Sequence, residues 1–317
     1  MREKYRIDSV VQAIVNERPD VIHANDLDAL IPSYIAKKKL GCRLIYDSHE
    51  ICCETRYYDK YWLYNQFMKQ TERHIVKRCE KMICVSHAAA EYFQEKFKIE
   101  KPLVITNCIL KEKVLIEHPA KNEGFEVLNH GILHDSRGLE MMRDSCRFFK
   151  EYPEIKMVAR GYGGIEKELK QQVADEQIDN FVFYPPVDPQ MLIYEAARSH
   201  VGVAVTLPVC LNFKLSVSNR LFEYAAAGIP VIMSDIPEHR YLNDQYHFGI
   251  IIENNEQKAF EEAVLRMYKD KEFYDQCSCN AITLATDISW EMQFALLIDF
   301  LNSIGNNSDG KTKITKD

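Results

Sequence analysis

The chain has 317 residues, of which 46% are hydrophobic and 27% charged, and this composition indicates a soluble globular protein long enough for two domains. A formal net charge of −7 argues against a nucleic-acid-binding protein, which would usually carry a basic excess. No stretch approaches the roughly 20 apolar residues of a membrane-spanning helix, and the charged start MREKYRIDSV has no apolar signal segment.

Strand-like and helical stretches alternate in the first third of the chain. The elements expected there are, in order, helix 6–17, strand 20–24, helix 27–39, strand 42–48, helix 62–79, strand 81–86, helix 87–97 and strand 102–108. This alternation is typical of parallel α/β sheets rather than of helix bundles or sandwiches.

Residues 111–124 are polar and aperiodic, which indicates an interdomain linker. The alternation then restarts with strand 125–131, helix 138–150, strand 155–161, helix 165–174, strand 181–185, helix 189–198, strand 201–207, helix 218–227, strand 229–235 and strand 249–253. Two helices, near 256–268 and 290–304, are expected to finish the fold, and the polar tail 306–317 is expected to be disordered.

Two features of the first half concern its completeness and its compartment. Only four strands precede the linker, whereas a complete Rossmann-like domain has about six or seven. Half a sheet would expose an apolar edge, so the chain is interpreted as a fragment, a chain with a misassigned start, or one part of a split protein. The ten cysteines form no CxxC pair or zinc-type spacing, which predicts reduced thiols in a cytoplasmic protein.

The segment SNRLFEYAAAGIPVIMSD, residues 218–235, places Glu223 inside a helix that ends at Gly228. A carboxylate there can accept hydrogen bonds from both hydroxyls of a ribose. The segment resembles the donor-binding domain of glycosyltransferase family 4, of the GT-B fold, with its pattern N-K-x-x-E-Y-x-A-x-G-x-P-V. The resemblance implies that Asn219 and Glu223 bind the donor; the alternative is a solvent-exposed helix glutamate.

The chain departs from the family pattern just before this helix. The family often has a second glutamate eight positions before Glu223, where this chain has Leu215. The loop CLNFKLSVSN is expected to supply Asn212 and Lys214 instead, although Lys214 could equally be a solvated surface charge.

The turn HGILHDSRGLE, residues 130–140, resembles the family's G-R-x4-K-G segment, whose two cations stabilise the departing nucleoside diphosphate. Gly131 and Arg137 match, whereas Ile132 replaces the first basic residue. A basic side chain beside a helix amino terminus suits a diphosphate. Arg137 is therefore a candidate catalytic residue, and the alternative is a surface arginine paired with Glu140.

The turn ARGYGG, residues 159–164, corresponds to a glycine turn of the family. Gly161 and Gly163 allow a tight turn that approaches a nucleotide closely. The alternative is an ordinary turn between a strand and a helix. Arg160 is a candidate to replace the cation that Ile132 removes.

The stretch DVIHANDLDALIPSYIAKKKLGCRLIYDSHE also resembles family 4. His49 follows its second strand, where the family has a histidine that contacts the donor sugar, and an imidazole can hold a sugar hydroxyl in reacting geometry. Asn25, Asp26 and Glu50 are candidates for the acceptor side. Asn25 and Asp26 could instead simply cap the next helix.

Residues 57–82 mix aromatic side chains with Lys and Arg. One interpretation is an interfacial patch that faces a lipid-linked acceptor. The commoner situation is an amphipathic helix that packs on the sheet and keeps its charges in water.

Together these features predict an α/β fold of two Rossmann-like domains. Residues 1–115 are expected to form a partial acceptor-side domain, and residues 116–305 a nucleotide-sugar-binding domain whose last helix packs back on the first. The resemblance implies retaining transfer from a nucleotide sugar to a glycan or lipid-linked acceptor in polysaccharide biosynthesis, without a metal or other cofactor. The expected location is the cytoplasm, including the inner face of the cell membrane.

Two other functions fit the same residues. One is a non-catalytic nucleotide-sugar-binding subunit, completed by a partner chain, which the short first half and the Leu215 and Ile132 departures favour. The other is a GT-B epimerase that acts on the nucleotide sugar alone.

Overall fold

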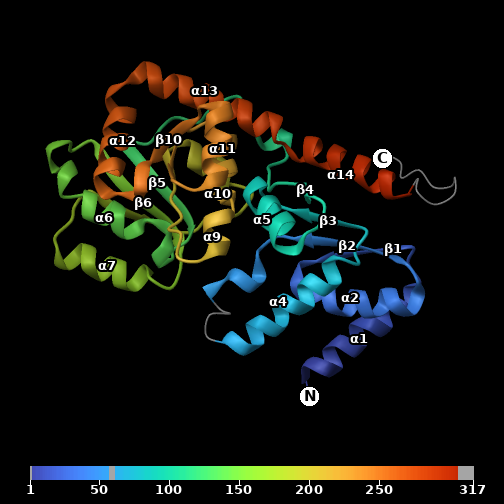
Figure 1. Cartoon of the computed structure of the whole chain (residues 1–317). Coiled ribbons are helices and arrows are strands. Elements are labelled where there is room, and N and C mark those ends of the chain that lie inside the picture. The colour runs from blue at the N-terminus through green and yellow to red at the C-terminus, as the bar shows by residue number, and fades with distance from the viewer. Residues whose placement is uncertain (1, 57–60, 306–317) are drawn as a thin grey trace. The chain divides into compact units, whose positions relative to one another are not determined.

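The computed structural model describes residues 2–56 and 61–305. It contains two parallel sheets, which confirms the predicted α/β class (Figure 1). The chain divides into two compact units: unit 1 runs to Thr106 and adds Cys210–Ser216 and the chain from Ala295, and unit 2 comprises Asn107–Val209 and Val217–Phe294. Within the described residues, no helix has the length and apolar character needed to span a membrane. The tail 306–317 lies outside the described residues.

Unit 1 contains a sheet of four parallel strands among its described residues, in the order β1-β2-β3-β4. The strands are β1 (Val21–Asn25), β2 (Arg43–Ser48), β3 (Lys81–Cys84) and β4 (Leu103–Val104). The helices are α1 (Arg2–Glu17), α2 (Asp26–Leu40), η1 (Cys52–Glu54), α4 (Trp62–Val76) and α5 (His87–Phe97). The four strands lie where the sequence predicts them, but β4 is shorter than expected.

The alternation of side chains in β2 and β3 gives this sheet two buried faces. Leu44 and Tyr46 join the core formed with α2, α4 and α5. Ile45 and Ile83 point to the other face and pack against apolar residues of α14 (Trp290–Gly305), namely Leu297, Phe300 and Leu301. The carboxyl-terminal helix therefore covers the second face of the unit 1 sheet.

A short helix from the second half of the sequence also belongs to unit 1. In α9 (Leu211–Leu215), the side-chain oxygen of Asn212 accepts a hydrogen bond from the Ile51 amide at 2.8 Å. The Ser86 hydroxyl donates to the Leu215 carbonyl at 2.5 Å. These bonds are made over more than a hundred residues of sequence, so local patterns could not reveal them.

Unit 2 contains six parallel strands in the order β10-β9-β8-β5-β6-β7. The strands are β5 (Phe125–Ile132), β6 (Ile155–Tyr162), β7 (Phe181–Tyr184), β8 (Val201–Ala204), β9 (Val231–Ser234) and β10 (Gly249–Ile252). The helices that connect them are η3 (Asp135–Arg137), α6 (Leu139–Ser145), η4 (Phe148–Glu151), α7 (Glu166–Asp175), α8 (Leu192–Ala197), α10 (Asn219–Ala226) and α11 (Pro237–Tyr246). In this doubly wound order the chain reverses direction across the sheet between β5 and β8.

The end of unit 2 differs from the prediction of two final helices. After the short η5 (Glu253–Asn255), three α-helices follow β10, namely α12 (Gln257–Lys269), α13 (Lys271–Asp287) and α14. The buried face of α13 consists largely of small residues such as Cys277 and Ala281, and α11 buries Glu238 and His239. Small or polar buried faces give little apolar periodicity, so neither α11 nor α13 was predicted.

The expected linker 111–124 packs on unit 2. Val114 is buried, the Leu115 amide donates to the Ala226 carbonyl at 2.9 Å, and the Asn122 amide donates to the Arg198 carbonyl at 2.8 Å. A polar, aperiodic segment is here ordered by backbone hydrogen bonds to α8 and α10 rather than by an apolar face.

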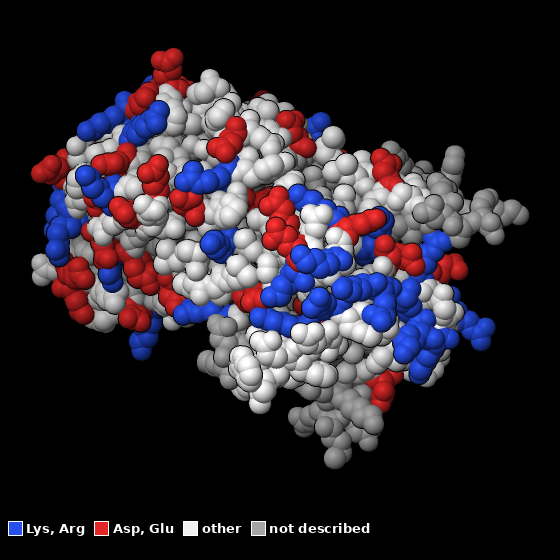
Figure 2. Space-filling model, in the orientation of Figure 1, with Lys and Arg blue, Asp and Glu red and all other residues white. Residues whose placement is uncertain are grey.

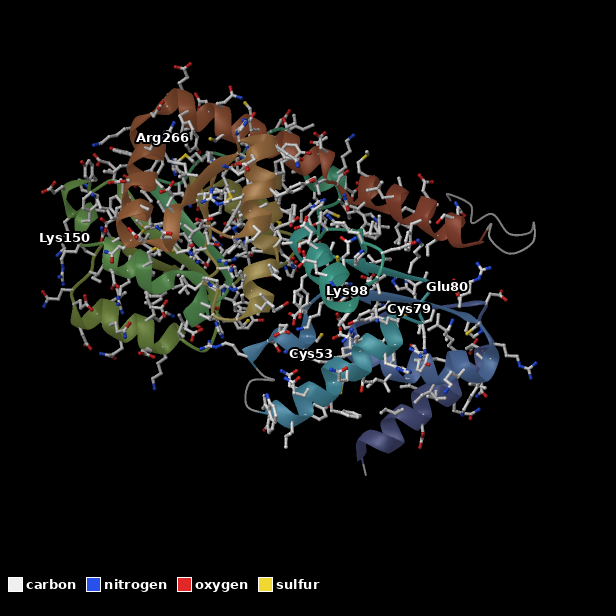
Figure 3. The ribbon with its side chains drawn as sticks, in the orientation of Figure 1. Cys53, Cys79, Glu80, Lys98, Lys150 and Arg266 are labelled. Atoms are coloured by element: carbon white, nitrogen blue, oxygen red, sulfur yellow. The ribbon has the colours of Figure 1, made fainter. Side chains whose placement is uncertain are left out.

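Unit 1 encloses a buried carboxyl group. Glu72 of α4 is 2% exposed, and the Tyr46 hydroxyl donates to it at 2.9 Å. Burial raises the pKa of Glu72 to about 7, although hydrogen bonds from Tyr46 and Cys53 lower it. Cys53 of η1 lies beside α4 (Figure 3). The fold therefore holds Glu72 protonated at a pH where an exposed glutamate is ionised.

This raised pKa predicts a stability change with pH. Protonated Glu72 contributes to the free energy of unfolding in full below about pH 4.5, and this contribution is lost as the pH rises through about 7. The reason is that the ionised carboxylate is solvated in the unfolded chain and buried in the folded one. Glu72→Gln keeps an acceptor for Tyr46 but cannot ionise. Between about pH 5 and pH 8 the variant should lose less stability than the wild type, by on the order of 2–3 kcal/mol.

Urea unfolding at each pH measures this difference. Glu91→Gln, which changes an exposed carboxylate of α5, is the matched control and should follow the wild-type pH dependence. Parallel pH dependence of the Glu72→Gln variant and the wild type would contradict the assignment.

Candidate functional site

The carboxyl ends of β5 and β8 form the point in unit 2 where a doubly wound sheet binds its ligands. His130 and Gly131 lie near the end of β5, and η3 follows with Arg137. Ser218 lies immediately before α10, and Glu223 is in that helix. The sequence-predicted residues Gly131, Arg137 and Glu223 therefore meet at one edge of one sheet.

Three predicted glycines shape the backbone at this edge. A Cβ atom on Gly161 would collide with the Gly131 carbonyl oxygen, and one on Gly163 would collide with the Leu133 backbone. Gly131 has φ +105° and no atom within 4 Å of the position that a Cβ would take. Gly161 and Gly163 thus allow close approach of β5 and β6, whereas Gly131 leaves open space for a ligand.

Glu223 is held by a histidine that the sequence analysis did not identify. His130 Nε2 lies 2.7 Å from Glu223 Oε2, and the two side chains are 1% and 21% exposed. Because an ionised carboxylate can only accept hydrogen bonds, His130 donates from Nε2. Burial lowers the pKa of His130, and the nearby Arg220 and Arg160 charges lower it further, although Glu223 opposes both effects. His130 is therefore neutral and fixes one carboxylate oxygen.

The ring of His130 rests on Tyr224, with ring centroids 4.4 Å apart. The Tyr224 hydroxyl accepts from the His130 amide at 3.0 Å and donates to the Leu128 carbonyl at 3.1 Å. His130 Nδ1 is buried without a hydrogen-bond partner among the described residues. A histidine near the end of a buried strand, directly before a glycine, is the signal that could have identified this residue.

Two arginines add positive charge at the same edge. Arg137 is half-buried, its Nη1 donates to the Ser218 hydroxyl at 3.5 Å, and burial lowers its pKa. Arg220 is buried and donates to Asn129 Oδ1 at 2.9 Å and to the Val203 and Val205 carbonyls at 3.2 and 2.9 Å. Burial lowers the pKa of Arg220 to about 10, so it stays charged at neutral pH.

Arg220 thus joins the ends of β5 and β8, a role that the sequence analysis missed. It occupies the basic position of the N-K-x-x-E motif, which is the signal that could have identified it. Asn219, the neighbouring predicted residue, is exposed and accepts from Asn107 at 2.7 Å. Arg160 pairs with Glu195 at 3.4 Å and lies over the Tyr184 ring, so its charge is already partly neutralised.

Unit 1 has its own polar cluster, at the carboxyl ends of β1 and β2. Asp26 accepts from the His49 amide at 2.9 Å and lies 3.2 Å from His49 Nδ1. Asp47 lies 3.0 Å from His23 Nε2 and 3.7 Å from His49 Nε2. Asp26 has φ +62°, a strained value for a residue other than glycine. The structure therefore orients His49 through Asp26.

The remaining predicted residues also lie in unit 1. Asn25 ends β1 and is paired in register with Asp47 of β2, and the exposed Glu50 follows His49. The side-chain oxygen of Asn212 accepts a hydrogen bond from the Ile51 amide, and Lys214 is exposed on α9. Within the part of the chain that the structure describes, no group of three or more His, Cys, Asp and Glu side chains is arranged to hold a metal ion.

Comparisons with known families and structures identify the family and the fold of the chain. Residues 111–283 match the family model described as Glycosyl transferases group 1, and residues 4–111 match the model described as Glycosyltransferase Family 4. An uncharacterized glycosyltransferase of Haemophilus influenzae is 23% identical over 223 residues. The match covers 68% of this chain and 59% of that relative, which is less than two thirds of its length.

Solved structures show the same fold at low identity. Anabaena HepE in complex with UDP is 17% identical, with a TM-score of 0.77 over 94% of this chain and 82% of that one. Sucrose-phosphate synthase from Thermosynechococcus elongatus is 14% identical, with a TM-score of 0.73 over 91% of this chain and 74% of that one. These similarities confirm the GT-B fold predicted from the sequence.

The contact between His130 and Glu223 predicts how His130 titrates. Its imidazole should stay neutral, with the proton on Nε2, below the pH at which histidine usually ionises. Glu223→Gln removes the negative charge that favours the imidazolium, so the pKa of His130 should fall further.

Nitrogen and carbon NMR shifts of labelled histidine report the tautomer and the titration. Glu140→Gln, a change to a carboxylate of α6, should leave the His130 titration unchanged. A rise in the pKa of His130 in the Glu223→Gln variant would show that the two side chains do not interact as described.

Proposed function

Because the chain belongs to the Glycosyl transferases group 1 family, we propose that it transfers a sugar from a nucleotide-sugar donor to a glycan or lipid-linked acceptor. In this proposal the transfer retains the anomeric configuration and serves the assembly of cell-surface polysaccharide. The observation that carries the proposal is that Glu223 and Arg137 lie at the same edge of the unit 2 sheet. This is the point between β5 and β8 where the chain reverses its direction across the sheet. The HepE structures with UDP and with UDP-glucose support a nucleotide-sugar donor.

Glu223 has the geometry required of a ribose-binding group. One carboxylate oxygen is fixed by His130 at 2.7 Å, while the side chain remains 21% exposed. A carboxylate has about four acceptor positions, so the pair of vicinal hydroxyls of a ribose can still bind to it. The open space beside Gly131 would receive the neighbouring part of the nucleotide.

Arg137 has the position required of a group that stabilises the leaving diphosphate. Its guanidinium adjoins Ser218 at the start of α10, on a half-buried surface where charge is less screened than in water. Negative charge grows on the diphosphate as the bond to the sugar breaks, and a cation fixed in advance stabilises that charge. The proposal assigns this function to Arg137 rather than to a metal ion.

In unit 1, we assign the orientation of a sugar hydroxyl to the His49–Asp26 pair. The Asp26 carboxylate accepts a hydrogen bond from the His49 amide and also contacts His49 Nδ1. These two contacts limit the orientation of the imidazole. A histidine held in this way can donate or accept one hydrogen bond in a reproducible direction.

The two residues of unit 2 should have separable kinetic effects. Glu223→Ala should raise the KM for the donor by about tenfold or more and leave kcat within about threefold, because ribose contacts are equal in the ground and transition states. Arg137→Ala should lower kcat by about 100-fold or more, because it stabilises charge that develops in the transition state.

Steady-state transfer assays measure both effects. Arg147→Ala and Glu176→Ala, which change an exposed ion pair elsewhere in unit 2, are the matched controls and should retain wild-type parameters. Unchanged kinetics in both the Glu223 and the Arg137 variants would refute the site.

A further inference from the structure

The start of α4 exposes large apolar side chains to solvent. Trp62, Leu63 and Phe67 are 66%, 75% and 64% exposed, and Tyr61 and Tyr64 beside them are also exposed. Isolated exposed apolar residues are common, but several adjoining ones usually mark an interaction surface. We call Trp62, Leu63 and Phe67 the apolar end of α4.

The core of unit 1 does not account for this surface. The buried face of α4 consists of Asn65, Met68, Glu72, Ile75 and Val76. The apolar end lies on the outward side of the same helix, so its first two turns are apolar where a helix packed on a sheet is normally polar. These side chains contribute little to folding, and their exposure indicates a surface that a binding partner covers.

The other end of the outward face is basic. Arg73, Lys77 and Arg78 are exposed there, and exposed Lys38 and Lys39 end the neighbouring α2. Glu72, the acidic residue of α4, is buried and points inward. Figure 2 shows basic side chains gathered over unit 1 next to uncharged surface. We call Arg73 of α4, together with Lys77 and Arg78 that directly follow the helix, the basic end of α4.

We infer that the outward face of α4 docks unit 1 on an anionic lipid bilayer. Tryptophan and phenylalanine enter the region between headgroups and acyl chains, while lysine and arginine bind lipid phosphates. A bilayer surface offers both environments side by side, and its charge is complementary to the basic end.

Neither the helix dipole nor a symmetric dimer accounts for the whole outward face of α4. Basic residues in the last turn of a helix interact favourably with its dipole, but this does not explain the exposed Trp62, Leu63 and Phe67. A symmetric dimer through this face would bring the same patch of both copies together. Between Trp62 and Arg78 the outward face carries no acidic side chain to neutralise the basic end, so charge disfavours that arrangement.

The position of α4 relates the inferred docking to the proposed site. The helix follows β2, so its apolar end lies toward the carboxyl edge of the unit 1 sheet, where His49 and Asp26 are located. A docked bilayer would bring lipid-linked substrates toward that edge. This last step rests on the proposed function, whereas the docking itself does not.

Vesicle co-sedimentation of the full chain tests the inference. Binding to phosphatidylcholine vesicles that contain about 30% phosphatidylglycerol should be at least about tenfold tighter than binding to pure phosphatidylcholine vesicles, and high salt should weaken it. The Trp62→Ser/Phe67→Ser and the Arg73→Gln/Lys77→Gln double variants should each lose about tenfold or more in affinity.

Matched changes on unit 2 are the controls. Ile116→Ser removes an apolar side chain that is 88% exposed, and Lys258→Gln/Lys271→Gln removes two exposed charges. Both control proteins should bind vesicles as the wild type does. Glu223→Ala should also bind normally, so that loss of transfer and loss of docking are separate results.

Fluorescence locates the contact on α4. Trp62 and Trp290 are the two tryptophans of the chain, so Trp290→Phe leaves Trp62 as the reporter. Its emission should shift to shorter wavelength on anionic vesicles and be quenched by brominated lipid.

Three results would overturn the inference. The first is no binding of the wild type at millimolar lipid. The second is equal binding by the wild type and both α4 double variants. The third is sedimentation of the wild type as a dimer that requires Trp62 and Phe67 and does not bind vesicles.

Discussion

The hydrogen bond between His130 and Glu223 is the contact on which the proposed donor-binding edge of unit 2 depends. It is made by a neutral, fully buried imidazole that rests on Tyr224 and is anchored through the strand backbone. Arg220 makes the arrangement possible, because its guanidinium joins Asn129 of β5 to the Val203 and Val205 carbonyls at β8. Without that connection, the strand ends would have to satisfy buried polar groups in another way, at a cost of roughly 1–3 kcal/mol each.

Both units orient their polar groups before any ligand arrives. In unit 1, Asp26 adopts a strained backbone conformation and holds His49 at its amide and its ring nitrogen. In unit 2, His130 holds Glu223. Groups that are oriented in advance lose little conformational entropy when a ligand binds. Enzymes use such fixed groups to position substrates and to stabilise the charge of the transition state. The buried Glu72 contrasts with both pairs, because burial raises its pKa to about 7. The exposed charged residues on the outward face of its helix are basic.

Much of the architecture could be predicted from local patterns. Apolar runs that alternate with helical periodicity located all ten strands of the described residues, because most of these parallel strands are buried and largely apolar. Helices α11 and α13 could not be found in this way, because their buried faces are polar or made of small residues. Glu223 and Arg137 followed from motifs, whereas His130 is one of several buried polar residues of β5 and belongs to no motif. The placement of α9 depends on the distant Ile51 and Ser86, which no local pattern reports.

The most direct test of the central claim compares a nucleoside diphosphate with its 2′-deoxy analogue by isothermal titration calorimetry. The nucleotide is the one that stabilises the chain most in a thermal-shift panel. If Glu223 binds the ribose hydroxyls, loss of the 2′-hydroxyl should weaken binding to the wild type by about tenfold and should have little further effect on Glu223→Gln. An equal loss in the two proteins would show that the carboxylate does not contact the ribose, and the assignment of the donor site would be wrong.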